Sequence, residues 1–257
     1  MTEARKTSIA CAFAAAAPGY DAAAQVQRRV AARLAEDLAT PVLPAGTRAV
    51  EIGCGTGLLT ERLLTAQPHT EWLITDIAAA MVAHCAARCG ASPAEFRVMD
   101  GEAPDLPSGR YDLIVSSLAV QWFSDLSTCL ARLSACLKPG GRLIFATLGA
   151  DTFEEWRAAH AELGLTGGTP AFPTTEALQA MWPAGGSGAV REERLTVWYP
   201  DGLGFVRGLK ELGAHLPQPG HRPLPPGAFR RVLRRFAAGC PATYQVLYGW
   251  YIKDSPL

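Results

Sequence analysis

The chain has 257 residues, 49% of them hydrophobic, and its 24 Lys and Arg residues balance its 24 Asp and Glu residues. This length and hydrophobic content provide for one sizeable α/β core and exclude wholesale disorder. A formal net charge of zero argues against non-specific nucleic-acid binding, which needs many phosphate contacts.

The first 45 residues predict helices that lie over the rest of the fold. Residues 5–16 superficially resemble a short secretory signal, but their apolar part is mostly alanine and therefore only weakly hydrophobic. The stretch continues into YDAAAQVQRRVAARLAEDL, which has helical periodicity. We interpret residues 1–45 as an N-terminal helix pair that forms a lid. No run approaches the roughly 18 apolar residues of a membrane span.

Strand-like and helix-like segments then alternate as far as Leu148. The expected strands are 48–53, 71–76, 95–100, 111–118 and 142–148, and the expected helices are 58–66, 78–89 and 126–137, with KPGG (138–141) as a turn. Short connections between such segments predict a parallel, doubly wound sheet with helices on both faces.

The remainder of the chain predicts a less regular region that completes the sheet. We expect helices at 152–163, 205–214 and 228–238, strands at 193–200 and 243–252, and loops at 164–173, 183–188 and 217–227. These segments are too interleaved for a separate domain. We expect one domain over 1–257, with a cofactor-binding core at 46–150 and a substrate-side cap at 151–257.

The loop VEIGCGTG (50–57) follows the first predicted strand and predicts a ligand site. Glycines weaken a strand, but they allow a turn to bring its backbone against a ligand. Gly57 follows Gly55 by two residues, whereas the dinucleotide fingerprint requires three. A nicotinamide dinucleotide is therefore not the expected ligand.

Two acids end the next strands and indicate a nucleoside with an amino-acid tail. Asp76 can accept hydrogen bonds from both ribose hydroxyls, and Asp100 or the amides after it can bind an adenine amino group. The amine and carboxylate of the tail would lie against the glycine turn.

These motifs resemble the class I S-adenosylmethionine-dependent methyltransferases, which implies a Rossmann-like seven-stranded sheet. EIGCGTG, TDI (75–77), MDGE (99–102) and LKPGGRLIFAT (137–147) occur in that family's order. The whole chain further resembles the malonyl-acyl-carrier-protein O-methyltransferases of biotin synthesis (BioC family). Residues 13–31, the AVQW segment, RGLKELGA and TYQVLYG carry this resemblance, while SSLA stands where SNLA is common.

The resemblance implies methyl transfer from S-adenosylmethionine to the free carboxylate of malonyl-acyl carrier protein, with S-adenosylhomocysteine as product. It assigns twelve residues to the cofactor: Gln27, Glu51, Gly53, Cys54, Gly55, Asp76, Ile77, Met81, Asp100, Gly101, Glu102 and Leu118. Glu51 is expected to orient the loop or the cofactor amine. A trans-aconitate-type methyltransferase and a non-catalytic cofactor-binding protein on the same fold remain alternatives.

The substrate side needs positioning groups rather than an acid or a base. A carboxyl group with a pKa near ~4 is already ionised at neutral pH, so we expect no catalytic triad and no metal. A buried carboxylate needs a cation or several donors, and Arg207 and Lys210 lie three residues apart on one predicted helix. The resemblance adds Tyr20, Gln121 and Trp122 as substrate-binding residues.

The cysteines bear on metal binding and on the cellular compartment. Seven scattered cysteines without a CxxC pair indicate neither zinc nor a disulfide framework and favour a cytoplasmic protein.

FRRVLRRF (229–236) predicts a helix with one basic face. Its four arginines would either face solvent or dock the acidic acyl carrier protein: Arg230, Arg231, Arg234 and Arg235.

Overall fold

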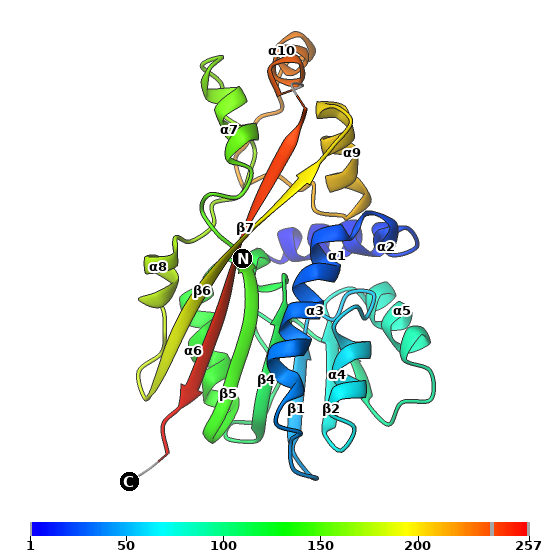
Figure 1. Cartoon of the computed structure of the whole chain (residues 1–257), viewed down its shortest axis with the longest axis vertical. Coiled ribbons are helices and arrows are strands. Elements are labelled where there is room, and N and C mark those ends of the chain that lie inside the picture. Colours follow the sequence, from blue (N-terminus) through cyan, green and yellow to red (C-terminus); the bar gives the residue numbers. More distant parts are fainter. Residues whose placement is uncertain (1, 237–238, 256–257) are drawn as a thin grey trace.

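The computed structural model describes residues 2–236 and 239–255, which form a seven-stranded sheet flanked by helices (Figure 1). The strands are β1 (Arg48–Ile52), β2 (Glu71–Asp76), β3 (Glu95–Val98), β4 (Tyr111–Ser117), β5 (Leu137–Leu148), β6 (Gly186–Trp198) and β7 (Pro241–Lys253).

The helices precede, connect and follow the strands. They are α1 (Glu3–Ala16), α2 (Tyr20–Ala23), α3 (Gln25–Ala39), α4 (Thr60–Ala66), α5 (Ala79–Cys89), the short 3-10 helix η1 (Val120–Trp122), α6 (Leu126–Cys136), α7 (Glu154–Ala161), α8 (Thr175–Gln179), α9 (Gly202–Glu211) and α10 (Pro226–Phe236).

The sheet has the order β3-β2-β1-β4-β5-β7-β6, which confirms the predicted doubly wound class. Strands β1 to β5 are parallel, while β7 runs antiparallel to both of its neighbours, β5 and β6. The chain turns in opposite directions from β1 and β4, so the carboxyl ends of these two strands flank the topological switch point. In open α/β sheets ligands bind in the crevice at that point.

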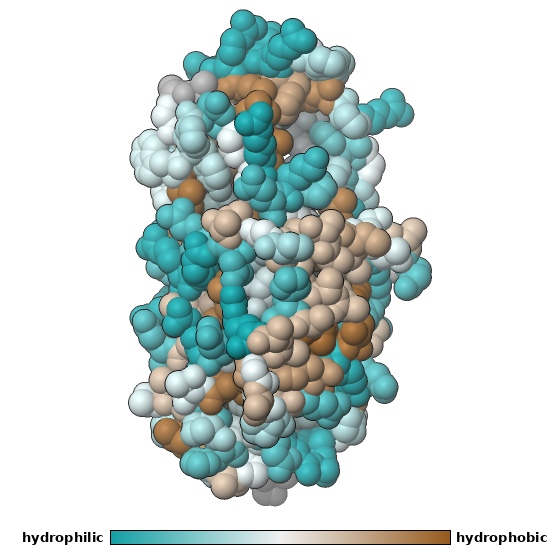
Figure 2. All heavy atoms as spheres, turned by 90° about the vertical axis from the view of Figure 1, so that its right-hand side faces the viewer, coloured by the Kyte–Doolittle hydropathy of each residue, from teal (hydrophilic) through white to brown (hydrophobic). Residues whose placement is uncertain are grey.

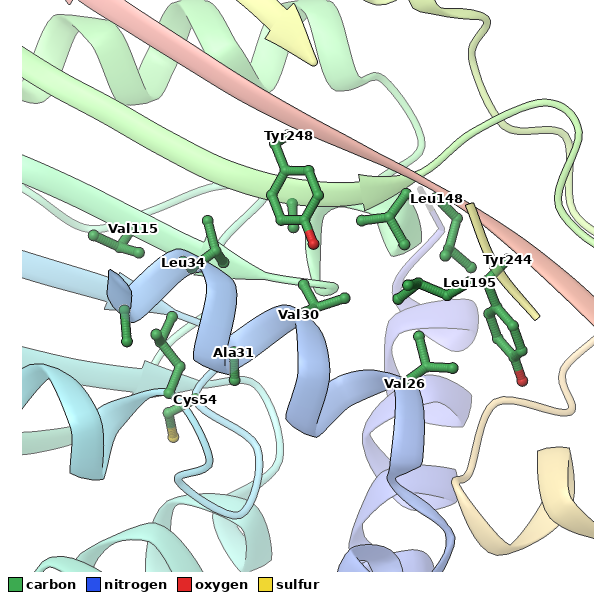
Figure 3. Packing of buried hydrophobic residues seen from close by; sticks show 14 of the residues in the cluster. Val26, Val30, Ala31, Leu34, Cys54, Val115, Leu148, Leu195, Tyr244 and Tyr248 are labelled. Atoms are coloured by element: carbon green, nitrogen blue, oxygen red, sulfur yellow. The ribbon is translucent and has the colours of Figure 1, made fainter. Parts of the chain in front are cut away.

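Two hydrophobic clusters hold the helices on the two faces of the sheet. One contains the inner faces of α3 and α4, and the other contains the inner face of α6. Along α3, Val26, Val30, Leu34 and Leu38 recur every four residues and are all buried. Figure 3 shows the first three of these directed toward side chains of the sheet, among them Tyr248.

Several element boundaries differ from those predicted. The N-terminal region forms three helices rather than two, and the short helix α8 had no prediction. KPGG lies within β5, because the pairing register shifts between Tyr111 and Leu113 and the extra residues are accommodated there. The expected loop 183–188 gives way to β6 at Gly186, since β7 offers a pairing partner along the whole length of β6. Residues 237–238 of the expected helix 228–238 lie outside the described residues.

Candidate functional site

The glycine loop after β1 forms one wall of a crevice at the switch point. Gly53, Gly55 and Gly57 all have positive φ angles, at 74°, 54° and 92°. A Cβ atom on Gly53 would lie 2.2 Å from the Cβ of Ala119, so this glycine allows two loops to pack closely. A Cβ on Gly55 would meet no atom within 4 Å, because this residue faces open space.

That open space is a cavity, which we call the glycine-loop cavity. It lies at the carboxyl ends of β1 to β4, under helices α1 and α2. Its walls are Ile9, Phe13, Tyr20, Ile52, Gly53, Gly55, Asp76, Ile77, Met81, Met99, Asp100, Gly101, Ser117, Leu118, Ala119, Trp122 and Phe123.

Asp76 ends β2 and directs its carboxylate at the glycine loop. One carboxylate oxygen accepts a hydrogen bond from the backbone N–H of Gly55 at 2.9 Å, and the other accepts one from Ala78 at 2.8 Å. Burial raises the pKa of Asp76 despite these bonds, which favour the ionised form. Each oxygen retains a lone pair with which it can accept a further hydrogen bond.

Glu51 is fully buried beneath the loop. Its Oε2 accepts a hydrogen bond from the Thr60 hydroxyl at 2.7 Å, whereas Oε1 has no hydrogen-bond partner among the described residues. Burial raises its pKa to about 8. Glu51 lines a small recess together with Gln27 and Cys54, and Tyr20, Gly53, Gly55 and Ser117 belong to both this recess and the glycine-loop cavity.

The N-terminal helices close the outer side of the glycine-loop cavity. Lys6 of α1 forms an ion pair with Asp100 and approaches Glu102 at 3.3 Å, and its hydrogen bond to Asp100 raises its pKa. Asp21 of α2 accepts a hydrogen bond from the Thr56 hydroxyl at 2.6 Å and pairs with Arg88. Ion pairs to the acids after β3 and contacts with the glycine loop therefore hold these helices in place.

A second cavity, which we call the aromatic cavity, opens beside the first. Its walls are Phe13, Tyr20, Gln27, Leu118, Gln121, Trp122, Leu148, Phe153, Pro170, Phe172, Leu209, Leu212, Ala214 and Tyr244. Phe13, Tyr20, Leu118 and Trp122 line both cavities, and the rings of Phe13 and Trp122 meet edge to face at 5.4 Å. A molecule in one cavity would thus lie against a molecule in the other.

Two of the three described non-glycine residues with positive φ angles lie at this site, and the third is Cys240. Leu118 and Phe153 have φ angles of 52° and 59°, and both line the aromatic cavity. A non-glycine residue in this region costs of order 1–3 kcal/mol, which surrounding structure must offset. Such residues cluster at ligand sites, and here they set the directions of two cavity walls.

Most of the residues predicted from the sequence line the two cavities or the recess at Glu51, but three do not. Glu102 follows β3 and is buried outside the cavities, where its carboxylate accepts a hydrogen bond from the Ser124 N–H at 2.7 Å and pairs with Lys6. Arg207 and Lys210 are exposed and line neither cavity, because α9 turns Leu209 and Leu212 inward instead. The structure thus differs from the expectation that these two cations face the substrate.

Several residues that line the two cavities were not predicted from the sequence as site residues. Ile9 and Phe13 recur at i,i+4 on the alanine-rich α1, and this spacing was the available signal. Phe153, Phe172 and Tyr244 come from the region after Leu148, where the sequence contains no ligand motif to mark them.

The crevice fits S-adenosylmethionine, the cofactor that the resemblance implies. The unpartnered oxygen of Glu51 suits an ammonium group, the open side of Gly55 leaves room for the amino-acid tail, and Asp76 suits a ribose. Among residues 2–236 and 239–255, no helix is long and apolar enough to span a membrane, and no cluster of three or more His, Cys, Asp or Glu residues could hold a metal ion.

The fold and the crevice define a methyltransferase, and residues 50–143 match a family described as a methyltransferase domain. The YcgJ protein of Bacillus subtilis has a similar fold, with a TM-score of 0.63, 15% identity, and coverage of 89% of this chain and 99% of that one.

Two curated relatives are much more similar in sequence. The malonyl-[acyl-carrier protein] O-methyltransferase of Magnetococcus marinus is 44% identical over 91% of this chain and 88% of its own length. The biotin biosynthesis bifunctional protein BioCD of Bordetella avium is 46% identical over 96% of this chain, which spans 52% of that relative. The chain belongs to the malonyl-[acyl-carrier protein] O-methyltransferase family.

Proposed function

We propose that the protein transfers a methyl group from S-adenosylmethionine to the free carboxylate of malonyl-acyl carrier protein, an early step of biotin synthesis. Membership of the family supports this reaction. The structural observation that carries it is the aromatic cavity, which shares four wall residues with the glycine-loop cavity. Two reactants held there would meet directly, and this proximity is a large part of catalysis.

The glycine-loop cavity would hold the cofactor. Asp76 would bind the ribose hydroxyls, Glu51 the amine of the amino-acid tail, and Asp100 with Gly101 the adenine. When bound, S-adenosylmethionine supplies a methyl group made electrophilic by its sulfonium. Tyr20 lines both cavities and the recess at Glu51, so it would seal their junction against water.

The aromatic cavity would receive the malonyl group without help from a general base, because a carboxylate is already ionised at neutral pH. The reaction forms a bond from a carboxylate oxygen to the methyl carbon and breaks the methyl–sulfur bond. The negative and positive charges disappear together, so an apolar site disfavours the charged reactants more than the transition state.

The cancellation of charge in the reaction is a reason for Arg207 and Lys210 to face away from the aromatic cavity. A cation beside the carboxylate would stabilise the charged ground state more than a transition state with partly cancelled charge. The polar side chains that line the cavity are neutral, namely Tyr20, Gln27, Gln121 and Tyr244. The amide Nε2–H groups of Gln27 and Gln121, which both line the cavity, would donate hydrogen bonds to the carboxylate and orient it.

Mass spectrometry of malonyl-acyl carrier protein after incubation with the protein and S-adenosylmethionine tests the proposed reaction. We expect the malonyl group to gain the mass of one methylene unit, and alkaline hydrolysis of the new methyl ester to release methanol. Cofactor binding without this product would favour the non-catalytic alternative. Methylation of trans-aconitate in its place would favour that substrate class.

Cofactor binding is expected to release a proton from Glu51. In the free protein its pKa is about 8, so Glu51 is largely protonated below that pH. An ammonium group beside it lowers this pKa, so affinity should rise with pH toward about 8 and then level off. Calorimetric titration with S-adenosylhomocysteine at several pH values measures both the affinity and the number of protons released. In Glu51→Gln the affinity should depend less on pH, and fewer protons should be released. An equally steep dependence in the variant would remove Glu51 from the role.

The exposed face of α10 would dock the carrier protein. Arg230, Arg231, Arg234 and Arg235 are all exposed, and Arg235 pairs with Glu162 of the segment after α7. Acyl carrier protein is strongly acidic, so this face would increase its rate of encounter in a salt-dependent manner.

Reversing Arg230 and Arg234 to Glu is expected to reduce kcat/KM for malonyl-acyl carrier protein about tenfold at low salt, with a smaller loss at high salt. Turnover of malonyl-pantetheine, which carries neither the protein nor a phosphate, or its inhibition of the reaction, should hardly change. The control is Arg29→Glu with Arg62→Glu, which changes the net charge equally on exposed residues of α3 and α4. Equal losses in both double variants would exclude a specific dock.

A further inference from the structure

A third hollow, which we call the outer groove, lies beyond the aromatic cavity. It is an open, largely apolar groove lined by Phe153, Trp156, Gly168, Thr169, Pro170, Phe205, Val206, Leu209, Ala214, His215, Leu216, Pro217, His221, Pro223 and Phe229. Four of these residues also line the aromatic cavity: Phe153, Pro170, Leu209 and Ala214. The two spaces therefore adjoin one another.

Helix α9 forms a continuous side of this path. Leu212, at its inner end, lines the aromatic cavity alone, Leu209 lines both spaces, and Phe205 lines the outer groove alone. Leu209 and Phe205 lie four residues apart, so the groove continues beyond the aromatic cavity for about 6 Å along the axis of α9. The helix packs against α2 at one end and α10 at the other, as Figure 1 shows.

Two exposed cations are adjacent in sequence to residues that line the outer groove. Phe229 of α10 lines the groove, and the exposed Arg230 follows it directly. Arg222 is also exposed and stands between His221 and Pro223, which both line the groove. Figure 2 shows hydrophobic side chains gathered near the end of the molecule where α10 lies, beneath a hydrophilic rim.

We propose that the outer groove holds the phosphopantetheine arm through which a carrier protein presents its thioester. The arm is a linear chain of methylene and amide groups that ends in a phosphate, which matches an apolar groove with arginines at its outer end. The malonyl group would lie in the aromatic cavity, the arm along α9, and the phosphate near Arg222 and Arg230. This inference rests on the proposed function and adds the route by which the substrate enters.

Three substrates separate the contributions of the arm and of the carrier protein. They are malonyl-acyl carrier protein, malonyl-pantetheine, which has the arm without the protein, and S-methyl malonyl thioester, which has neither. The small compounds are measured as substrates or as inhibitors of carrier-protein turnover. Val206→Trp narrows the outer groove, and Leu203→Trp places the same side chain on the exposed side of α9 as a control.

We expect Val206→Trp to reduce kcat/KM, or to weaken inhibition, at least tenfold for the two substrates that carry the arm. S-methyl malonyl thioester and S-adenosylhomocysteine affinity should be unaffected, and Leu203→Trp should behave as wild type. Leu216→Trp narrows the groove from the loop and should give the same pattern if Val206→Trp folds poorly.

Unchanged use of malonyl-pantetheine by folded groove variants would overturn the proposal, as would equal losses on all three compounds. Failure of the wild-type protein to methylate any malonyl thioester would instead contradict the proposed function. The two failures are therefore distinguishable.

Discussion

Replacing Gly55 with valine is expected to abolish detectable binding of S-adenosylhomocysteine while the protein stays folded. The Cβ of Gly55 would meet no protein atom within 4 Å, so a valine side chain would project into the glycine-loop cavity. It would fill the space that we assign to the amino-acid tail of the cofactor. Calorimetric titration measures the binding, and far-UV circular dichroism and the Tm report the fold.

Gly46→Val is the matched control for this change. Gly46 also has a positive φ, at 80°, and its Cβ would likewise meet nothing within 4 Å. It precedes β1, at the opposite end of the strand from the glycine loop. A valine in a left-handed backbone costs roughly 1–2 kcal/mol in either place, so the two variants should lose similar stability. If Gly55→Val kept its affinity, or if Gly46→Val lost as much, the loop would not be the cofactor site.

Asp76→Ala is expected to weaken cofactor binding by at least about tenfold. The carboxylate would accept hydrogen bonds from the ribose, and a bond to a charged group contributes roughly 1.5–3 kcal/mol. It also holds the Gly55 N–H at 2.9 Å, so its removal would loosen the loop that binds the amino-acid tail. Both losses act on the same ligand, and a titration with S-adenosylhomocysteine measures their sum.

Asp112→Ala provides a comparison near the amino end of β4, away from the carboxyl ends of the strands that line the crevice. Asp112 accepts a hydrogen bond from the backbone N–H of Arg48 at 2.9 Å and pairs with Lys138, and it lines neither cavity. Its loss should leave cofactor affinity within about twofold of wild type. If Asp76→Ala lowered cofactor affinity less than twofold, the Asp76 carboxylate would not bind the ribose and would only stabilise the glycine loop.

Sequence reasoning predicted a set of residues that meet at one crevice, because these residues follow strands in a fixed order. Gly55 and Asp76 occupy the carboxyl ends of β1 and β2, and parallel strands bring their carboxyl ends to one edge of a sheet. The antiparallel position of β7 was outside that reasoning, although the participation of the tail in the sheet was predicted.

The substrate side was harder to predict because it depends on how a helix is rotated. Arg207 and Lys210 share one face of α9, but spacing alone cannot say which face is inward. In the structure the apolar face of Phe205, Leu209 and Leu212 is buried, since exposing it would cost more than exposing two solvated cations. The ion pair of Lys6 with Asp100 joins residues 94 positions apart, and no local pattern indicates such a contact.

The position of β7 between β5 and β6 leaves strand edges unpaired while the chain is being synthesised. Synthesis proceeds from the N-terminus, and β7 pairs with β5 on one side and β6 on the other. Until residues 241–253 have left the ribosome, β6 has no strand beside it and β5 has one open edge. Strands with open edges are the templates for aggregation. A nascent chain stalled before residue 241 therefore leaves one edge of β5 and both edges of β6 unpaired, and release of β7 pairs the β5 edge and one edge of β6 at once.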